Sequence, residues 1–559
     1  MEEPRLAEKI DAILADFFSS WNLVSTVLVL LVIGLLTYPL LTSKDPDTHP
    51  FLLARQAQVA PVRHSGESAV YRAIDIPHGY PLRAGLGVKD PGTPRWSAGR
   101  PGDLRDIWRR AVSGSVKEDG TPTGEKGKIQ TVLGRERIID HDFADLTLDI
   151  NVIGQHIKRN NGQSVAVCLS NSVELLSSIF AGSFYGFSTT LLPHGVSTEV
   201  FKSLLSKTTA DYLIADAGTI DLDDISSANK SIKNIIWVSK AAGQHIDWTE
   251  KSPRGFSVTS WKALVDENKA TTNSEVLPLD KDSQVPPVSI FTPISATSYD
   301  VVKYTSENLI SATAALLATL PRTHKLSTSD TVLSTLSFTN SYPLAWALAA
   351  LYSNATLSIN SVAGDGVPLD AAVSLARPSI LITSPTTITN YLKHPSTIHP
   401  SGLAVYTGSR SLRSGNLPSS RGQPSSAMLS NLRAVFIPQH IPGDTSVTSS
   451  SSSRLTSSDL STLRLTLTAR VGYALTTPLV AGAVTQTNIL DYRDKGKDVV
   501  MVGAPLSSVE IHLEGEEEFV GTQKPSGRLA VKGPVVVGGG KVVLDAVVRI
   551  DDDHTIILS

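Results

Sequence analysis

The chain has 559 residues, of which 41% are hydrophobic and 18% charged, and its formal net charge is −3. This composition is typical of a globular protein, and at about 150 residues per domain the length predicts several folded units. The charge balance gives no electrostatic reason to expect a nucleic-acid partner. The single cysteine, Cys168, excludes an intramolecular disulfide and a thiolate zinc cluster, and so few thiols are typical of a reducing compartment.

The N-terminal residues predict a membrane anchor. Residues 1–16 form a short amphipathic segment, and residues 17–43 contain no charged side chain and are long enough to cross a hydrocarbon layer of about 30 Å. Trp21 and Tyr38 flank the apolar run as interfacial residues do. A cleaved signal peptide is the alternative, which the acidic residues of the preceding segment disfavour. We therefore expect one transmembrane helix over residues 17–43.

The side of the membrane follows from the rest of the chain. Basic residues are nearly balanced around the anchor, with Arg5 and Lys9 before it and Lys44 and Arg55 after it. Because one cysteine indicates a reducing compartment, we expect residues 44–559 in the cytosol. The endoplasmic reticulum is the first candidate membrane, and the mitochondrial outer membrane, the peroxisome and the lipid-droplet surface are alternatives.

The body of the chain alternates between strands and helices. Residues 44–103 are rich in proline and glycine and predict an extended lead-in, and the first helix is expected at 104–112. From residue 148 onward, short β-branched runs follow apolar helical segments in two blocks, separated by the linker 281–287. This alternation predicts an α/β fold with two αβ subdomains, each built on a mostly parallel sheet.

The remaining segments are less regular. Residues 409–426 and 444–458 are rich in serine and poor in apolar residues, which predicts mobile surface loops. Residues 471–559 contain short strands with turn residues, which predict a small β-rich lobe. Within it, the acidic run 551–554 is interpreted as a solvated turn rather than a metal site.

One stretch, residues 287–310, has the order of a phosphate-binding unit. PVSIFTPISATSYDVVKYTSENLI predicts a strand, a polar loop and a helix. A loop that surrounds phosphates needs glycine for close approach of its N–H groups, and usually a lysine for charge. This stretch contains no glycine, so its function has to be judged from the rest of the chain.

Several motifs, in the same order, resemble the adenylate-forming AMP-binding superfamily, and most closely its long-chain acyl-CoA synthetases. They are SVAVCLSNSVELLSSIFAGSFYGFSTTLLPHG, LSTSDTVLSTLSFTNSYPLAWALAALYSNATL, VGYALTTPLVAGAVTQT, VGAPLSSVEIHL and PSGRLAVKGPVVVGGG. The resemblance implies an AMP-binding-like α/β domain over residues 104–470 and the β-rich lobe after it. Members activate a carboxylate with ATP and Mg²⁺ and pass the acyl group to a thiol.

The resemblance places the family's phosphate loop, YTSGTTGxPKG, on the stretch at 287–310. Thr292 and Ser295 match its hydroxyl positions, and Asp300 stands where the family has lysine. Side chains occupy the glycine positions: Ile294, Thr297 and Val301. A carboxylate near a triphosphate adds repulsion of roughly 1 kcal/mol or more. Realignment to Lys303 is the alternative.

Further positions depart from the family in the same direction. Asn340 stands where the family commonly has a histidine, and Thr477 replaces the glutamate that would hold Mg²⁺, for which a hydroxyl is a poor substitute. The resemblance implies that Tyr473 stacks on adenine and that Thr476 donates a hydrogen bond.

The ribose-binding aspartate of the family is degraded near the C-terminus. The resemblance aligns Ala546 with it, and Asp545 would fill the position if the alignment shifts by one residue. The chain also stops at Ser559, where the family continues into a C-terminal domain that we expect to be absent here.

Together these departures predict a membrane-anchored pseudoenzyme with a scaffold or regulatory role near lipid metabolism and an unidentified protein partner. We expect no metal ligands and no cofactor, with ATP and Mg²⁺ only if activity survives. Two alternatives remain: a divergent long-chain fatty acid–CoA ligase, and a non-catalytic protein that binds a fatty acid or acyl-CoA. In the pseudoenzyme, the residues that still match the family, Tyr473, Thr476, Gly503 and Gly533, would be kept only for turns and packing.

Overall fold

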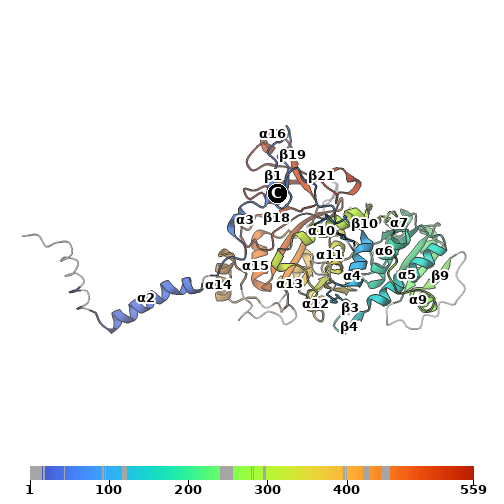
Figure 1. The fold of residues 1–559 in the computed structure, drawn as a ribbon, viewed down its shortest axis with the longest axis horizontal. Helices are drawn as coiled ribbons and strands as arrows, with labels where there is room; N and C mark the ends of the chain where they lie inside the picture. Colours follow the sequence, from blue (N-terminus) through green and yellow to red (C-terminus); the bar gives the residue numbers. More distant parts are fainter. Residues whose placement is uncertain are drawn as a thin grey trace, which may run out of the picture. The chain divides into compact units, whose positions relative to one another are not determined.

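The computed structural model describes most of the chain (Figure 1). The described residues are 15–16, 19, 21–42, 44–90, 93–94, 96–115, 123–239, 256–278, 280, 283–293, 298–394, 397, 399–418, 429, 431–441 and 454–558. They belong to two compact units, Met1–Asp47 and Thr48–Ser559.

The first unit contains the helix α2 (Leu23–Thr42), which lies within the predicted anchor. Large apolar side chains on it are exposed, among them Leu23, Leu28 and Leu35. In the part of the chain that the structure describes, no helix combines the length and the hydropathy needed to cross a membrane. The structure therefore does not support the predicted transmembrane helix over residues 17–43.

The second unit contains a seven-stranded sheet in the order β11-β10-β6-β5-β7-β8-β9. Its strands are β5 (Ser164–Cys168), β6 (Ser188–Leu191), β7 (Tyr212–Asp216), β8 (Asn234–Val238), β9 (Ser257–Ser260), β10 (Val288–Pro293) and β11 (Tyr299–Tyr304). Neighbours pair in parallel except at the β10–β11 hairpin. Strands such as β7 are buried along their whole length, which explains their continuous apolar sequence.

A second sheet has fifteen strands in the order β1-β2-β19-β20-β21-β22-β18-β17-β16-β15-β14-β12-β13-β3-β4. These are β1 (Ala57–Val59), β2 (Tyr71–Ala73), β3 (Ile129–Leu133), β4 (Arg137–His141), β12 (Thr331–Ser334), β13 (Thr356–Asn360), β14 (Ile380–Ile382), β15 (Ala434–His440), β16 (Arg470–Thr477), β17 (Val480–Gln486), β18 (Val500–Pro505), β19 (Glu510–Glu514), β20 (Ser526–Lys532), β21 (Lys541–Ile550) and β22 (Ile556–Leu558). The run β3-β13-β12-β14-β15-β16 is parallel, and the strands from β16 to β2 pair antiparallel.

Helices cover the sheets and pack between them (Figure 1). They are α3 (Pro50–Ala54), α4 (Leu104–Ser113), α5 (Phe143–Arg159), α6 (Val173–Tyr185), α7 (Thr198–Ser206), α8 (Leu222–Ala228), α9 (Trp261–Asn268), α10 (Ser306–Ala318), α11 (Ser341–Tyr352), α12 (Leu369–Val373), α13 (Pro385–Lys393), α14 (Gly402–Arg413), α15 (Ser457–Leu467) and α16 (Glu517–Val520). Helix α4 packs against α11 on one side and against α5 and α6 on the other. Its Trp108 contacts Phe143 of α5 and Phe180 of α6.

The mixed α/β architecture with large sheets confirms the predicted fold class in its coarse form. The transmembrane helix in that prediction is not supported, and the division into residues 44–103, 104–470 and 471–559 stays a prediction. Strand β16 is the last parallel strand and the first of the antiparallel run, so the β-rich segment continues the parallel sheet.

Three local predictions are wrong in part. The lead-in 44–103 is not wholly extended, because it contains the short helix α3 and the strands β1 and β2, of which β2 pairs with β19, far away in the sequence. The predicted loop 409–426 begins inside α14, whose Leu412 is buried against Leu465 and Tyr492. The predicted loop 444–458 ends inside α15, whose N-cap is Thr456. Residues 419–428 and 444–453 lie outside the described residues.

Two glycines of the resemblance have structural roles. Gly503 has φ +83°, and a Cβ there would lie 2.1 Å from the carbonyl oxygen of Gln486. Gly533 has φ +147°, and a Cβ there would lie 2.2 Å from the carbonyl oxygen of Ser508. Both positions require glycine for backbone conformation and close approach, independently of any ligand.

Candidate functional site

A cavity of about 370 Å³ lies where the carboxyl ends of strands from both sheets meet. The seven-stranded sheet contributes the ends of β6 and β10 and residues of β11, and the larger sheet contributes the segments that follow β12, β13 and β14 and the ends of β15 and β16. The carboxyl ends of parallel strands are the usual place for a ligand in α/β proteins. This cavity is the candidate functional site.

The stretch 287–310 contributes a hairpin to this cavity. Strand β10 pairs antiparallel with β11, and Thr292 faces Asp300 across the hairpin. The sequence prediction of a strand followed directly by a loop and a helix missed β11. The helix α10 begins as predicted, because the Thr305 hydroxyl accepts a hydrogen bond from Asn308 N (3.2 Å) and Asn308 Oδ1 accepts one from Thr305 N (2.9 Å).

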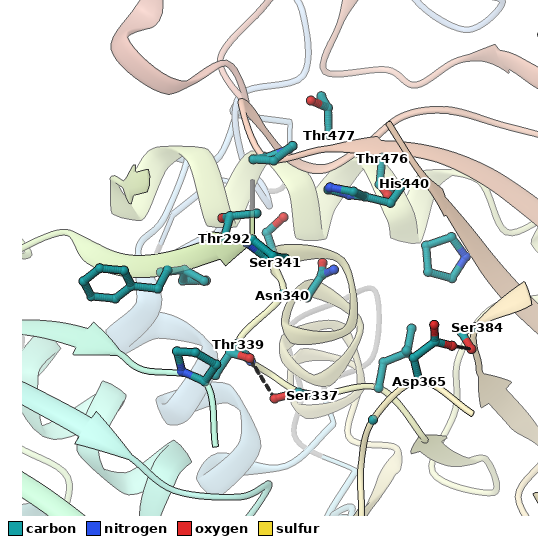
Figure 2. A pocket seen from close by; sticks show the side chains of 18 of the residues that line it. Thr292, Ser337, Thr339, Asn340, Ser341, Asp365, Ser384, His440, Thr476 and Thr477 are labelled. Atoms are coloured by element: carbon teal, nitrogen blue, oxygen red, sulfur yellow. Dashed lines mark hydrogen bonds between the residues drawn. The ribbon is translucent and has the colours of Figure 1, made fainter. Parts of the chain in front are cut away.

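Four of the predicted residues line the cavity together: Thr292, Asn340, Thr476 and Thr477 (Figure 2). Asn340 is the N-cap of α11, and its Oδ1 accepts a hydrogen bond from Tyr342 N (3.0 Å). The Thr476 hydroxyl donates to the carbonyl oxygen of Gln439 (3.2 Å). The structure thus brings together residues that are nearly 190 positions apart in the sequence.

Tyr473 is not among the residues that line the cavity. It is fully buried, its hydroxyl donates to Gln439 Oε1 (2.6 Å) and accepts from Leu455 N (3.1 Å), and burial is the main cause that raises its pKa. In this arrangement the ring belongs to the core rather than to a stacking surface.

Four other predicted positions also lie away from the cavity lining. Asp300 is exposed on β11, and Lys303, the alternative cation, faces Ser289 near the other end of the hairpin. Asp545 and Ala546 lie on β21, where Asp545 forms an ion pair with Arg528 (3.4 Å). Ser295 lies outside the described residues.

The cavity also contains polar residues that sequence reasoning missed. Asp365 Oδ1 accepts a hydrogen bond from the Ser384 hydroxyl, as Figure 2 shows, and Oδ2 accepts one from the Thr386 hydroxyl (3.2 Å). His440 ends β15, and burial lowers its pKa to about 4, so its imidazole is neutral near pH 7. The sequence contained a signal for Asp365, Ser384, Thr386 and His440. Each of them follows or ends an apolar strand, and parallel sheets bind ligands at the carboxyl ends of their strands.

The electrostatics of the cavity do not fit a triphosphate with Mg²⁺. Among the described lining residues there is no lysine or arginine, and Asp365 is the single carboxylate. The hydroxyl of Thr477, at the position implied for the metal ligand, is buried and has no hydrogen-bond partner among the described residues. Phosphates need cations or inward N–H groups, and Mg²⁺ needs carboxylate oxygens. The side chains of the described lining therefore suit neither a triphosphate nor Mg²⁺.

A larger cavity, of about 720 Å³, lies beside β3, β4 and the carboxyl ends of β5, β7 and β8. Carboxylates line it, including Asp149, Glu174 and Asp216. Burial raises the pKa of Asp149 to about 7, although Trp261 Nε1 donates a hydrogen bond to it (3.3 Å). None of the predicted site residues lies in this cavity.

The geometry defines an α/β protein with a ligand-sized cavity at the carboxyl ends of two adjoining parallel sheets. Comparison with known families is more specific, because the model of the AMP-binding enzyme family matches residues 136–539. The chain therefore belongs to the AMP-binding enzyme family. A search of curated protein sequences returned no match.

Solved structures agree with this fold. The anthranilate CoA ligase AuaEII in complex with anthranoyl-AMP is 12% identical, with a TM-score of 0.58 over 84% of this chain and 79% of that one. A benzoate CoA ligase from Burkholderia xenovorans LB400 is 12% identical, with a TM-score of 0.56 over 82% and 79%. The N-terminal domain of FACL13 from Mycobacterium tuberculosis is 11% identical, with a TM-score of 0.57 over 82% of this chain and 100% of that one. At these identities the likeness establishes the fold alone, and closeness to long-chain acyl-CoA synthetases in particular is not confirmed.

Proposed function

We propose that this member of the AMP-binding enzyme family does not form adenylates and acts as a pseudoenzyme, with a scaffold or regulatory role near lipid metabolism. The observation that carries the proposal is the charge of the cavity. Adenylate formation develops and transfers negative charge on phosphate, and enzymes stabilise that charge with fixed cations, N–H groups or a metal. The described lining offers hydroxyls and one carboxylate for this purpose.

The sequence between β10 and β11 offers no replacement for the missing cations. Residues 294–297 include neither glycine nor lysine. Asp365 is the one carboxylate among the described lining residues, and hydrogen bonds from Ser384 and Thr386 hold it in the segment after β13, whereas the family's glutamate aligns with Thr477 on β16.

Pyrophosphate release tests the proposal. The full chain, incubated with ATP, Mg²⁺ and a panel of fatty acids and aromatic acids, should release no pyrophosphate above the rate without acid. A divergent ligase would give acid-dependent release, and that result would replace the pseudoenzyme with the ligase alternative. Release must then fall in the Thr476→Val variant, which separates this chain's activity from a contaminating enzyme.

A second candidate function is binding of a fatty acid or acyl-CoA without chemistry. The open volume of the cavity favours it, together with the apolar surfaces of Ile290, Phe291 and Leu336. We expect a labelled fatty acid to be retained at one per chain and lost in Leu336→Trp, which fills the cavity. Equal retention by both proteins would reject this site.

We also propose that residues 17–43 attach the protein to a membrane, with the endoplasmic reticulum as the first candidate. The exposed apolar side chains of α2 support this proposal. Residues 48–559 form a separate compact unit, so removal of residues 1–47 is a clean comparison. In flotation with phospholipid vesicles, the full chain should float and the shortened chain should not. Flotation of both would place the attachment elsewhere.

A further inference from the structure

A cluster of two glutamates and a histidine lies on the β-rich part of the second unit, away from the residues that line either cavity. His512 and Glu514 are two residues apart on β19, so their side chains lie on the same face of the strand. Glu67 joins them because its backbone forms a bridge with that of Glu514, and Ser68 N donates to the carbonyl oxygen of Leu513 (2.8 Å).

The distances between the three side chains match the edges of a metal coordination sphere. His512 Nε2 lies 3.5 Å from Glu67 Oε1 and 3.4 Å from Glu514 Oε1, and one ligand atom from each residue lies within 4.8 Å of the others. A tetrahedral Zn²⁺ with bonds of about 2.0–2.1 Å separates its ligands by about 3.3 Å. The two measured edges are close to this value.

The imidazole supplies the observation that points to a ligand. His512 is 2% exposed, and its Nε2 has no hydrogen-bond partner despite facing two carboxylates. Oε1 of Glu514 is also buried, and it forms an ion pair with the ammonium of Lys541. Buried polar atoms are nearly always hydrogen-bonded, so a buried imidazole nitrogen that faces two carboxylates without a hydrogen bond indicates a position where a further group fits.

We propose that Glu67, His512 and Glu514 form a Zn²⁺ site. Imidazole nitrogen with two carboxylate oxygens is a Zn²⁺ ligand set, whereas Mg²⁺ and Ca²⁺ prefer oxygen ligands alone. The side chains of Glu67 and Glu514 are each 29% exposed, so water can reach the fourth position. Bound Zn²⁺ would fasten the segment around Glu67 to β19, two parts of the chain that are more than 440 residues apart.

Lys541 is the competitor for this position. Its ammonium forms an ion pair with Glu514 and lies 3.5 Å from Glu67 Oε1, and its side chain is 34% exposed. In the metal-free protein it partly neutralises the two carboxylates. Zn²⁺ binding requires the ammonium to move toward solvent, so Lys541 should weaken the affinity without abolishing it.

Titration of the full-length protein with Zn²⁺ in competition with a chromogenic chelator tests the site. We expect one Zn²⁺ per chain, with affinity at least about tenfold weaker in Glu67→Gln and in His512→Asn. Lys541→Met should bind roughly tenfold more tightly, because a like charge is removed. Glu510→Gln is the matched control, since its carboxylate on the same strand pairs with Arg72 (2.6 Å) and its loss should leave the affinity unchanged.

Three outcomes would overturn the site. The first is no stoichiometric Zn²⁺ in either the wild type or Lys541→Met, which would make Lys541 the permanent counterion of the cluster. The second is unchanged affinity in Glu67→Gln, a partly exposed position whose variant should fold even if His512→Asn does not. The third is equal weakening by the Glu510→Gln control.

Discussion

Two groups of polar side chains in the second unit differ in their charges. At the C-terminal end of the larger sheet, Asp553 is 5% exposed and accepts hydrogen bonds from Arg493 (2.7 Å) and Lys495 (2.8 Å). The cavity at the strand ends has hydroxyls, one carboxylate, and no lysine or arginine among its described lining residues. Among the described residues, paired charges therefore stabilise the fold near Asp553, whereas the cavity lining has no lysine or arginine.

Whether an acidic residue stabilises the fold depends on the cations and hydroxyls that surround its carboxylate. The run 551–554 was predicted to be a solvated turn, and that prediction is wrong for Asp553, whose carboxylate is buried among two cations and the Thr555 hydroxyl (2.6 Å). Asp552 in the same run is exposed. Removing the charge of Asp553 should therefore change stability much more than removing the charge of Asp552.

The largest expected effect comes from removing the charge of Asp553. Asp553→Asn removes the buried carboxylate that Arg493 and Lys495 share, while each cation keeps a second carboxylate, Asp491 or Asp551, so the free energy of unfolding should fall by about 2 kcal/mol. Urea unfolding followed by circular dichroism measures the change. Asp552→Asn is the control, because its partner Lys524 and its own side chain are exposed and the change should be small. Equal effects of the two variants would remove the distinction between the regions.

Acid should weaken the same region. Burial alone would raise the pKa of Asp551, but hydrogen bonds from Lys495 (2.7 Å) and Lys524 (3.3 Å) outweigh it and lower the pKa to about 2. A carboxylate with a depressed folded pKa stabilises fully above its unfolded pKa of about 3.9, and this contribution is lost as the pH falls through its folded pKa. We expect a loss of about 1–2 kcal/mol between pH 4 and pH 2, allowing for solvent screening.

Unfolding free energies of the wild type and Asp551→Asn over this pH range check the assignment. The variant should be less stable near pH 7 and should lose less stability on acidification. Parallel curves for the two proteins would assign the acid sensitivity to other carboxylates.

In the cavity, replacing the polar side chain of Thr477 by an apolar one should raise the free energy of unfolding rather than lower it. The Thr477 hydroxyl is buried without a partner among the described residues, so Thr477→Val removes an unsatisfied group at nearly constant shape. We expect stability to rise by about 1 kcal/mol, measured by urea unfolding. Thr476→Val is the matched control and should lower stability, because the Thr476 hydroxyl donates to the Gln439 carbonyl. A loss of stability in Thr477→Val would mean that this hydroxyl has a partner, such as a bound ligand.

Much of the fold could be predicted because its signals are local. Buried parallel strands are continuous β-branched runs, so β5, β7 and β8 were expected where they occur, and Ser172 caps α6 with a hydrogen bond from Leu175 N (3.2 Å). Strand β11 was missed because a six-residue run with alternating polar residues forms a strand only through its pairing with β10.

The candidate site was predicted less completely because it depends on which distant segments meet. The resemblance identified Thr292, Asn340, Thr476 and Thr477, which the structure brings together. It could not place Tyr473 in the core, since that depends on Gln439 of the neighbouring strand. Asp365 and His440 carry no motif: their place after or at the end of a strand indicates the edge of the sheet, but their meeting in one cavity follows only from the order of strands.

Calorimetric titration of the full chain with ATP in the presence of Mg²⁺ tests the central claim most directly. The described lining residues of the cavity include no lysine or arginine and one carboxylate, Asp365, so we predict no saturable heat at ATP concentrations up to the millimolar range. Saturable binding at one ATP per chain, dependent on Mg²⁺ and abolished by Thr476→Val, would contradict the account and identify a working nucleotide site.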